Sequence, residues 1–568
     1  MFDLLIRNGL IVDGTGTPGY RGDVALADGR IVEIGDIAHT ATARRTIDAK
    51  GLVVCPGFID PHTHYDAQVT WDPLLSCSSW HGVTTVIMGH CGVGLAPCKP
   101  EDRDAVAMDL VTIESIPFEA LKQGVPWNWV SFAEYMDAAE QRGLGINVGF
   151  VAALTPFRRW VLGAEATERA ATPEETTQIA ALLREAVAAG AFGFSTTFLK
   201  HHFGDGGKPL GCRMASREEL TAYANVLAEL DRGIIELALS ESGEIGETEH
   251  AILQHLVDES NRPVTWVFLL ARDDKPQAAF DSLDRTAALI ERGCRPQVMP
   301  TPLTIQFDLH TPAISLSNMP SWKPLFGADV ATQMRAYADP AFRAAFAADL
   351  QAWGVKWPWD RTEVYGVKSP ALQALVGKTV AAIAAERNAE PRDVFLDIAL
   401  EDNLDLRYSV RLFNVDVERV GMLITDPRTL LGLSDAGAHI DVFCTADYTT
   451  HLLGAWVRDM RVLTLERAIQ RITSEPAAFF GIRDRGKLER DLAGDIVVFD
   501  PETVDSMLRP EMIYDFPDSV GRLVTRSKGI HYTIVNGQVL YEPGQGTVGG
   551  TASARAGRVL RSTPGKAG

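Results

Sequence analysis

Two histidines separated by one residue stand at the end of an apolar run in PGFIDPHTHYD, residues 56–66. Side chains at positions i and i+2 of a strand point to the same face, so His62 and His64 can reach one metal ion. A lone H-x-H is more often a pair of solvated loop histidines. Here the strand that precedes it places both imidazoles where barrel enzymes carry their active sites. The motif therefore predicts a metal centre.

Two further segments could complete such a centre, because each follows a predicted strand. Cys91 lies in MGHCGVGLAP and could be a thiolate ligand or a small buried residue. Asp435 lies in GLSDAGAH and could bind metal and take a proton from water, or could cap a turn. His439, at the end of the same segment, could contact the substrate. Each of these motifs is ambiguous when taken alone.

The elements that must position these residues alternate between strand and helix. Thr172 and Pro173 open a helix that ends at Gly190, and Ser216 with Glu219 forms a capping box for the next one. Apolar strands are predicted at 53–60, 84–89, 146–152, 191–198, 233–239, 263–269, 295–300, 407–412 and 429–434. We interpret 407–412 as an accessory strand. Repeated βα units then predict an α/β fold with a TIM-like (β/α)8 barrel.

The two ends of the chain carry β-strand patterns with Asn-Gly and Asp-Gly turns. We therefore predict a small β-sandwich domain built from both termini, residues 1–55 plus 486–545. The hydrolase barrel would occupy 56–485, with an insertion or lid at about 301–395 that is rich in Pro, Trp and Asp. The tail 546–568 is rich in Gly, Ala, Ser and Arg and is expected to be disordered.

The composition of the chain disfavours some classes of binding partner. The 568 residues carry a formal net charge of −20, which disfavours binding to nucleic acid or to an anionic membrane. Seven cysteines without a C-x-x-C pattern make a disulfide framework unexpected. The start of the chain has a strand pattern and lacks the organisation of a signal peptide. We expect a cytoplasmic protein with a small-molecule partner, and the sequence leaves a homo-oligomer open.

Taken together, these motifs resemble the amidohydrolase superfamily, and within it the N-acyl-D-amino-acid deacylase (D-aminoacylase) branch. The resemblance runs from DLLIRNGLIVDGTG through PGFIDPHTHYD, GHCGVGLAP and GAFGFSTT to GLSDAGAH and LAGDIVVFDPETV. It implies a TIM-like barrel with a β-sandwich, one or two zinc ions, and amide hydrolysis. His62 and His64 match the metal-binding histidines, and Cys91 matches the cysteine ligand. Asp435 matches the metal-binding catalytic acid/base.

The sequence departs from that family at two ligand positions. The deacylases carry one histidine at the end of strand five and one at the end of strand six. Here these strands read GIIELALSESG and PVTWVFLLARDD, and neither contains a histidine. The site of one cysteine and two histidines cannot form as such, which leaves the role of Cys91 open. His62, His64 and Asp435 would still suffice for a single ion with an open position.

A replacement ligand could come from FLKHHFGDG, residues 198–206. Lys200 could be carboxylated and bridge metals, as lysines are in the related hydantoinases. His201 and His202 could bind metal or substrate, and Arg272 could hold a substrate carboxylate. The function predicted first is metal-dependent hydrolysis of the amide bond in an N-acyl amino acid or related amide. The alternatives are a cyclic-amide hydrolase that uses Lys200 and a catalytically degenerate binding scaffold.

Overall fold

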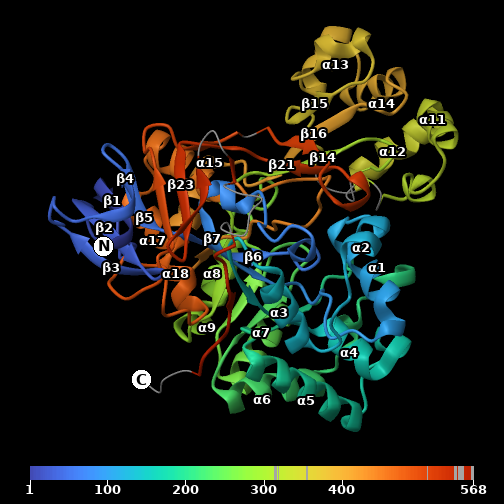
Figure 1. The fold of residues 1–568 in the computed structure, drawn as a ribbon. Helices are drawn as coiled ribbons and strands as arrows, with labels where there is room; N and C mark the ends of the chain where they lie inside the picture. Colours follow the sequence, from blue (N-terminus) through green and yellow to red (C-terminus); the bar gives the residue numbers. More distant parts are fainter. Residues whose placement is uncertain are drawn as a thin grey trace.

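Parallel strands form the centre of the computed structural model, and helices cover them (Figure 1). The structure describes residues 1–312, 316, 319–352, 356–507, 509–542, 546–547 and 555–564. The central strands are β6 (Phe58–Thr63), β7 (Val83–Met88), β8 (Asn147–Phe150), β9 (Ala152–Ala153), β10 (Gly193–Thr197), β11 (Ile234–Ala238), β12 (Val264–Val267), β13 (Arg295–Val298) and β17 (Leu430–Leu431). Nearly all their side chains are buried, as expected for parallel strands covered by helices.

These strands pair with their neighbours in chain order. Strands β6, β7 and β8 form one parallel set, and β9 to β13 with β17 form a second. A parallel bridge between Thr63 and Ala436 joins the end of the first strand to the loop after the last one. The carboxyl ends of β6, β7 and β17, which carry the sequence motifs, therefore lie at the same edge of the strand series.

Helices of varied length pack on this series, and α5 and α6 are the two that the sequence signals predicted. The main ones are α1 (Arg103–Glu114), α2 (Phe118–Gly124), α3 (Phe132–Arg142), α4 (Leu154–Leu162), α5 (Pro173–Ala189), α6 (Arg217–Leu230), α7 (Glu247–Ser260), α8 (Ala278–Arg285), α9 (Ala287–Glu291), α15 (Val417–Thr425), α16 (Tyr448–His451), α17 (Leu465–Ile472) and α18 (Ser474–Phe479). The capping boxes predicted at Thr172 and Ser216 are confirmed. Among the described residues, none of the helices has the length and apolarity needed to cross a membrane.

Strands from both chain ends form one nine-stranded sheet beside the parallel series (Figure 1). Its members are β1 (Phe2–Ile11), β2 (Tyr20–Ala27), β3 (Arg30–Gly35), β4 (Ala43–Asp48), β5 (Val53–Pro56), β18 (Ile496–Phe499), β23 (Ile530–Val535), β24 (Gln538–Glu542) and β25 (Gly546–Thr547). The N-terminal part meets the C-terminal part where β5 pairs antiparallel with β18. Pairing of the two ends, as the sequence predicts, thus occurs through a continuous sheet.

A buried carboxylate connects this sheet to the parallel strands. Asp495 lies just before β18 and accepts hydrogen bonds from the backbone of Asn536 (2.7 Å) and the side chain of Asn147 (2.9 Å). Arg485, 5% exposed, forms an ion pair with the same carboxylate. Because Asn147 belongs to β8 and Asn536 follows β23, one side chain holds the two parts of the fold together.

We expect Asp495→Ala to lower the free energy of unfolding by about 3–5 kcal/mol, because it removes the buried partner of Arg485, Asn147 and Asn536 and leaves the guanidinium, among the described residues, only the half-exposed carboxylate of Asp484. A shift of the urea or thermal midpoint would measure this. Asp459→Ala, which removes an exposed partner of Arg458, is the matched control and should shift the midpoint little. Equal shifts for the two variants would contradict the assigned role of Asp495.

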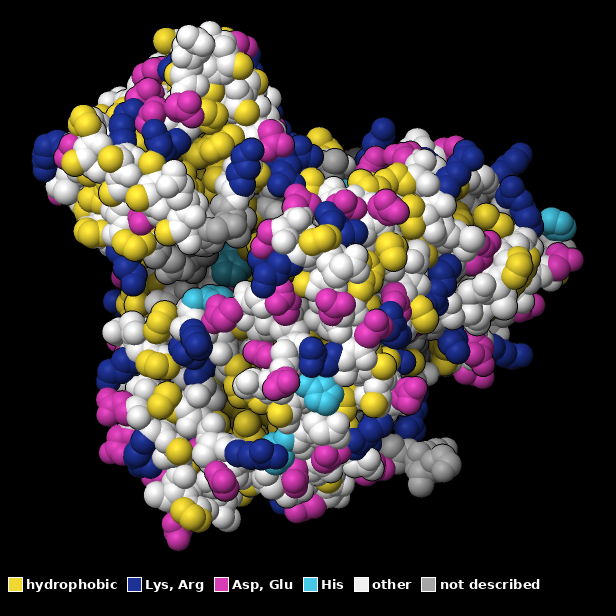
Figure 2. Space-filling model, turned by 180° about the vertical axis from the view of Figure 1, so that it is seen from behind, with side chains coloured by type: hydrophobic (Ala, Val, Ile, Leu, Met, Phe, Trp, Pro, Cys, Tyr) yellow, Lys and Arg dark blue, Asp and Glu magenta, His cyan; other side chains and the backbone are white. Residues whose placement is uncertain are grey.

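An inserted lobe stands apart from the parallel strands with its own hydrophobic core (Figure 1). It comprises β14 (Leu303–Phe307), α11 (Val330–Ala338), α12 (Pro340–Ala352), β15 (Thr362–Gly366), α13 (Val380–Arg387), α14 (Pro391–Glu401) and β16 (Arg407–Phe413). The strand predicted at 407–412 is β16, which pairs with β14 and β15 in a separate three-stranded sheet. Figure 2 shows the lobe projecting over a hollow in which histidine side chains are visible.

Part of the C-terminal tail is ordered, contrary to the expectation for 546–568. Strand β26 (Val559–Leu560) pairs in parallel with β8, and Arg561 forms ion pairs with Asp137 and Glu140. The sequence composition suggested disorder, but two buried apolar side chains and this arginine provide contacts that a disordered tail lacks. Residues 548–554 and 565–568 lie outside the described residues.

Candidate metal centre

Four potential ligand atoms from three strand ends converge at one point. The Nε2 atoms of His62 and His64 are 3.2 Å apart, and the Sγ atom of Cys91 lies 3.7 Å from Nε2 of His62. Oδ1 of Asp435 is 3.4 Å from Nε2 of His62 and 3.5 Å from Nε2 of His64. The structure therefore brings together the two histidines, the aspartate and the cysteine whose role the sequence left open.

The spacing of these atoms fits a tetrahedral divalent cation. With Zn–N distances of about 2.0–2.1 Å and Zn–S of about 2.3 Å, ligand atoms on one zinc ion lie about 3.3–3.7 Å apart. Four of the six separations between these atoms are 3.2–3.7 Å, close to that range. Two imidazoles, a thiol and a carboxylate are also the ligand types that zinc prefers. The residues present therefore fit such an ion.

Backbone conformation places all four side chains: the two histidines by the alternation of a strand, and Cys91 and Asp435 by left-handed loop residues. His62 and His64 alternate with Thr63 at the end of β6, so both imidazoles face the same side. Cys91 and Asp435 lie in loops after β7 and β17 and adopt left-handed φ angles of 54° and 49°. Such angles are uncommon for residues other than glycine and occur often at functional sites.

Buried Glu236 stabilises the left-handed conformation of Cys91. This residue lies in the middle of β11, and its Oε2 atom accepts a 2.8 Å hydrogen bond from the backbone N–H of Cys91. Its Oε1 atom is 3.9 Å from Nδ1 of His62, on the side of the ring opposite the cluster. Glu236 therefore holds the backbone of Cys91 and places a negative charge near His62 without a hydrogen bond to that ring.

His90 forms a second group of potential ligands with the same residues. Its ring stacks on His62, with centroids 4.1 Å apart, and its Nδ1 atom is 3.7 Å from Oε2 of Glu236. His62, His90 and Glu236 are fully buried, with one ligand atom from each within 4.8 Å of the others. Neither ring nitrogen of His90 has a hydrogen-bond partner among the described residues. The group shares His62 with the four-atom cluster.

Glu114 provides the corresponding support for His64. It is the last residue of α1 and 2% exposed, and its Oε1 atom lies 3.0 Å from Nδ1 of His64. A carboxylate on the outer nitrogen of a metal-binding histidine holds the ring in place and makes it a stronger ligand. The backbone carbonyl of Glu114 also accepts a 2.6 Å hydrogen bond from the N–H of His439.

We expect Glu114→Gln to weaken metal binding about 10–100-fold, the range typical of outer-shell partners of metal-binding histidines. The amide keeps the size of the side chain but removes the charge that favours His64 as a ligand. Competition with a chromophoric chelator would measure the affinity. Glu119→Gln on the neighbouring helix α2 is the control. An unchanged affinity in Glu114→Gln would show that this contact does not tune the site.

The protonation of the cluster agrees with a site built for a cation. Burial lowers the pKa of His62 well below its usual value, and the charges of His90 and His64 add to this. Burial, and then the negative charge of Glu236, raises the pKa of the Cys91 thiol well above its usual value. For His64, burial acts to lower the pKa, but Glu114 and the contacts to Asp435 and Cys91 outweigh it and raise the pKa. A bound dication would favour the thiolate form of Cys91.

Apolar side chains occupy the strand ends where the deacylase histidines would lie. Ala238 ends β11 and Val267 ends β12, and both are buried in one hydrophobic cluster with Cys91. Leu199 and Leu433 complete this wall. Hydrophobic contacts with Cys91 therefore occupy the two strand ends at which the resemblance led us to expect histidines.

Three of the sequence candidates lie outside the cluster with partners of their own. The side chain of Lys200 is exposed in the loop after β10. His201 is exposed, and its Nδ1 atom is 2.6 Å from Oε2 of Glu241. Arg272 forms an ion pair with Asp274 at 2.6 Å and lies over the ring of Phe413. The structure does not bring these three to the four ligand atoms.

His202 and His439 lie closer to the cluster. Burial lowers the pKa of His202 well below its usual value, and the charges of His201, His439 and His64 act in the same direction. Its Nδ1 atom is 3.0 Å from the Thr197 hydroxyl. His439 is half-buried, and its ring lies 4.9 Å from that of Phe443. Both histidines remain candidates for contact with a substrate.

Comparison with known proteins identifies the family of this chain. The profile of the amidohydrolase family matches residues 45–541, most of the chain. The chain belongs to the amidohydrolase family. It is 28% identical to the D-aminoacylase of Alcaligenes xylosoxydans xylosoxydans over 578 residues, 99% of this chain and 98% of that relative. An N-acyl-D-glutamate deacylase of the same organism is also 28% identical, over 98% of this chain and 96% of that relative.

Solved structures share the fold of this amidohydrolase. The N-acyl-D-glutamate deacylase of Bordetella bronchiseptica, solved with zinc and a phosphonate inhibitor, superimposes with a TM-score of 0.66 at 24% identity, covering 99% of both chains. A D-aminoacylase structure gives the same TM-score and identity, covering 99% of this chain and 100% of that one. The solved structures show the shared fold, and the family match with the similarity to D-aminoacylase places the protein in the D-aminoacylase-like branch, a group of hydrolases acting on carbon–nitrogen bonds.

Proposed function

We propose that this amidohydrolase hydrolyses the amide bond of an N-acyl amino acid or a related amide with the help of one divalent metal ion, zinc being preferred. The convergence of four residues carries the proposal, because Nε2 of His62 lies 3.2–3.7 Å from a ligand atom of His64, Cys91 and Asp435. The relatives named as D-aminoacylase and N-acyl-D-glutamate deacylase, similar over nearly their whole length, support the reaction type. The parallel strand order and the Thr63–Ala436 bridge support the TIM-like barrel predicted from the sequence.

Each residue of the site has a proposed role in the hydrolysis that follows from its position. A bound ion would supply Lewis-acid chemistry, polarising the amide carbonyl and making water more acidic. Asp435, whose side chain is 27% exposed, also lines a small cavity with Tyr65 and Phe443, and it can accept the proton of the attacking water. It then passes that proton to the leaving nitrogen. Glu114 and Glu236 hold His64 and Cys91 throughout.

His202 and His439 are proposed to contact the substrate near His64, and Arg272 to act farther out. Arg272 already pairs with Asp274, so a substrate carboxylate would have to share its guanidinium. The exposed side chain of Lys200 gives no structural support for the cyclic-amide alternative that needs it as a bridging carbamate. The four convergent ligand atoms argue against a degenerate scaffold, because a binding module has no need of them.

Metal analysis of the purified protein, together with an activity panel, tests this proposal. We expect about one equivalent of zinc per chain. His62→Ala should lose that metal, because Nε2 of His62 is the ligand atom that lies near the ligand atoms of His64, Cys91 and Asp435. His255→Ala on α7, away from the cluster, is the control and should retain the metal. A panel of N-acyl-D- and N-acyl-L-amino acids would identify the substrate. Substoichiometric metal that is equal in the parent and His62→Ala would refute the proposal.

A further inference from the structure

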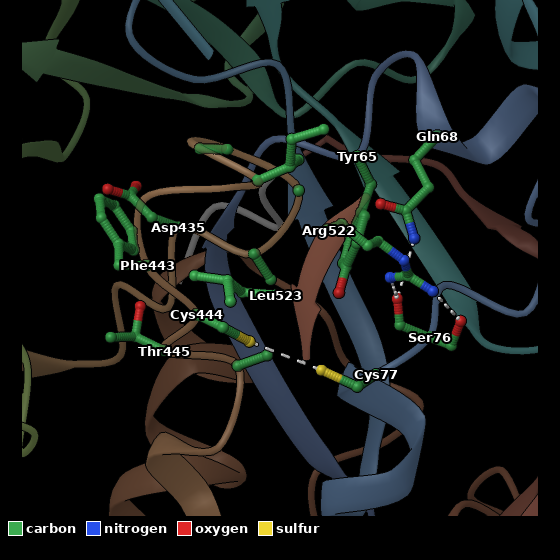
Figure 3. Close-up of a pocket in the computed structure, with 15 residues that line it drawn as sticks. Tyr65, Gln68, Ser76, Cys77, Asp435, Phe443, Cys444, Thr445, Arg522 and Leu523 are labelled. Carbon is green, nitrogen blue, oxygen red and sulfur yellow. Dashed lines mark hydrogen bonds between the residues drawn. The ribbon is translucent and has the colours of Figure 1, made fainter. Parts of the chain in front are cut away.

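Two thiols lie in contact behind the loop that carries Asp435. The Sγ atoms of Cys77 and Cys444 are 3.7 Å apart, although the residues are 367 positions apart in the sequence. A disulfide requires about 2.05 Å between the sulfurs, so each would have to move by only about 0.8 Å. Figure 3 shows the two side chains pointing toward each other. Neither belongs to the metal cluster.

The surroundings of Cys77 favour its thiolate, the reactive form of the side chain. A hydrogen bond from Cys444 lowers the pKa of Cys77 well below its usual value, and His81 and Arg522 add to this against the effect of burial. The guanidinium of Arg522 is held next to Cys77 by hydrogen bonds to the backbone carbonyl (2.5 Å) and hydroxyl (2.9 Å) of Ser76. A positive charge is therefore fixed beside this thiol.

A small oxidant can approach the pair from the cavity that contains Asp435. Cys77, Cys444 and Asp435 all line that cavity (Figure 3). Cys77 is almost fully buried, whereas Cys444 is half-buried. The half-buried Cys444 and this small cavity are the side from which a molecule the size of hydrogen peroxide would approach.

The position of Cys444 connects the pair to the Asp435 loop. The neighbouring Thr445 hydroxyl donates a hydrogen bond to the backbone carbonyl of Ser434, the residue before Asp435. On the other side, the segment that ends at Cys77 is fixed because Asp72 accepts hydrogen bonds from the backbone N–H (3.0 Å) and hydroxyl (2.6 Å) of Ser76. A bond between the two sulfurs would therefore link the loop that carries Asp435 to the hydrogen-bonded segment that ends at Cys77.

We propose that Cys77 and Cys444 form a redox-active pair, oxidised to a reversible disulfide by a hydroperoxide and reduced again by a dithiol. The Cys77 sulfur attacks the peroxide O–O bond and becomes a sulfenic acid, and the alcohol or water leaves. The Cys444 sulfur then attacks that sulfenic sulfur, the S–S bond forms, and the hydroxyl leaves with a proton as water. Two thiols lose two electrons in total, and the peroxide accepts both. The pair is independent of the proposed amide hydrolysis.

Treatment of the intact protein with a small excess of hydrogen peroxide tests the proposal. After removal of the peroxide and denaturation, which exposes the buried cysteines, we expect two of the seven thiols to be unreactive toward Ellman's reagent, and prior treatment with dithiothreitol to restore both. Mass spectrometry should find one cross-linked peptide pair containing Cys77 and Cys444, about 2 Da lighter than the reduced pair. Hydrogen exchange of the amides at 440–445 should slow in the oxidised form, because the loop is then tethered.

Serine variants provide the controls. Cys444→Ser should leave Cys77 as a sulfenic acid that a dimedone probe labels, with no cross-link. Cys294→Ser, which removes a buried thiol on the far side of the strand series, should still form the cross-linked pair. Because the peptide map uses the parent protein, the test does not depend on the folding of any variant. Seven reactive thiols after treatment, or a cross-link between other cysteines, would overturn the proposal.

Discussion

Asp435→Asn is expected to lower kcat by about 10²–10⁴-fold, the usual contribution of a positioned general acid–base group. Asparagine has nearly the same shape, but its amide cannot accept a proton from water at neutral pH. Its oxygen can still face His62 and His64, from which the carboxylate oxygen is 3.4 and 3.5 Å away. We therefore expect the loss to fall mainly on kcat, with a smaller change in KM.

The comparison requires metal content and steady-state kinetics on the same samples. Asp441→Asn removes an exposed carboxylate from the same loop and should leave both nearly unchanged. If Asp435→Asn lost its metal entirely, the carboxylate would act chiefly as a ligand. If it kept both metal and full kcat, the proton-transfer role would be refuted.

Cys91→Ser is expected to weaken metal binding at least about 100-fold, more than the loss of an outer-shell partner does. Serine is neutral at the pH at which a thiolate would bind the ion, and it is a poor zinc ligand. The substitution changes only the ligand atom. Sγ of Cys91 lies 3.7 Å from Nε2 of His62, whereas the backbone N–H of Cys91 is held by Glu236 and is present in serine too. Activity should fall in proportion to the metal that is lost.

Cys98→Ser is the matched control, since Cys98 is equally buried but lies outside the cluster. Metal content by mass spectrometry and competition with a chelator would separate the two variants. Unchanged affinity in Cys91→Ser would mean that His62, His64 and Asp435 hold the ion without the thiol. Two equivalents of metal in the parent, one of them lost in Glu236→Gln, would instead indicate that His90 and Glu236 bind an ion of their own.

The apolar wall at the ends of β11 and β12 explains why a single ion is proposed. Ala238 and Val267 belong to one hydrophobic cluster with Cys91 at the strand ends where the resemblance predicted histidines. The thiol therefore has imidazole partners on the His62 and His64 side and hydrophobic neighbours on the other. A second ion on the hydrophobic side would lack ligands among the described residues there.

Local sequence patterns were sufficient to predict much of this protein. Two-residue periodicity placed His62 and His64 on one face of a strand, and capping residues marked the starts of α5 and α6. Turn signals at both ends predicted that the N-terminal and C-terminal segments lie in one β-structure. Strand β5 of the first segment pairs with strand β18 of the second. These features depend on neighbours a few residues apart, so the sequence alone contains the information.

Tertiary structure alone decided the rest of the site. Cys91 contacts His62, Glu236 reaches the Cys91 amide from 145 positions away, and Glu114 approaches His64 from the end of a helix. A lone acid in the apolar strand IIELA was a signal for Glu236, whereas no pattern marked Glu114. Such contacts depend on the order and register of paired strands and on helix packing, which bring distant residues together and leave no local periodicity in the sequence.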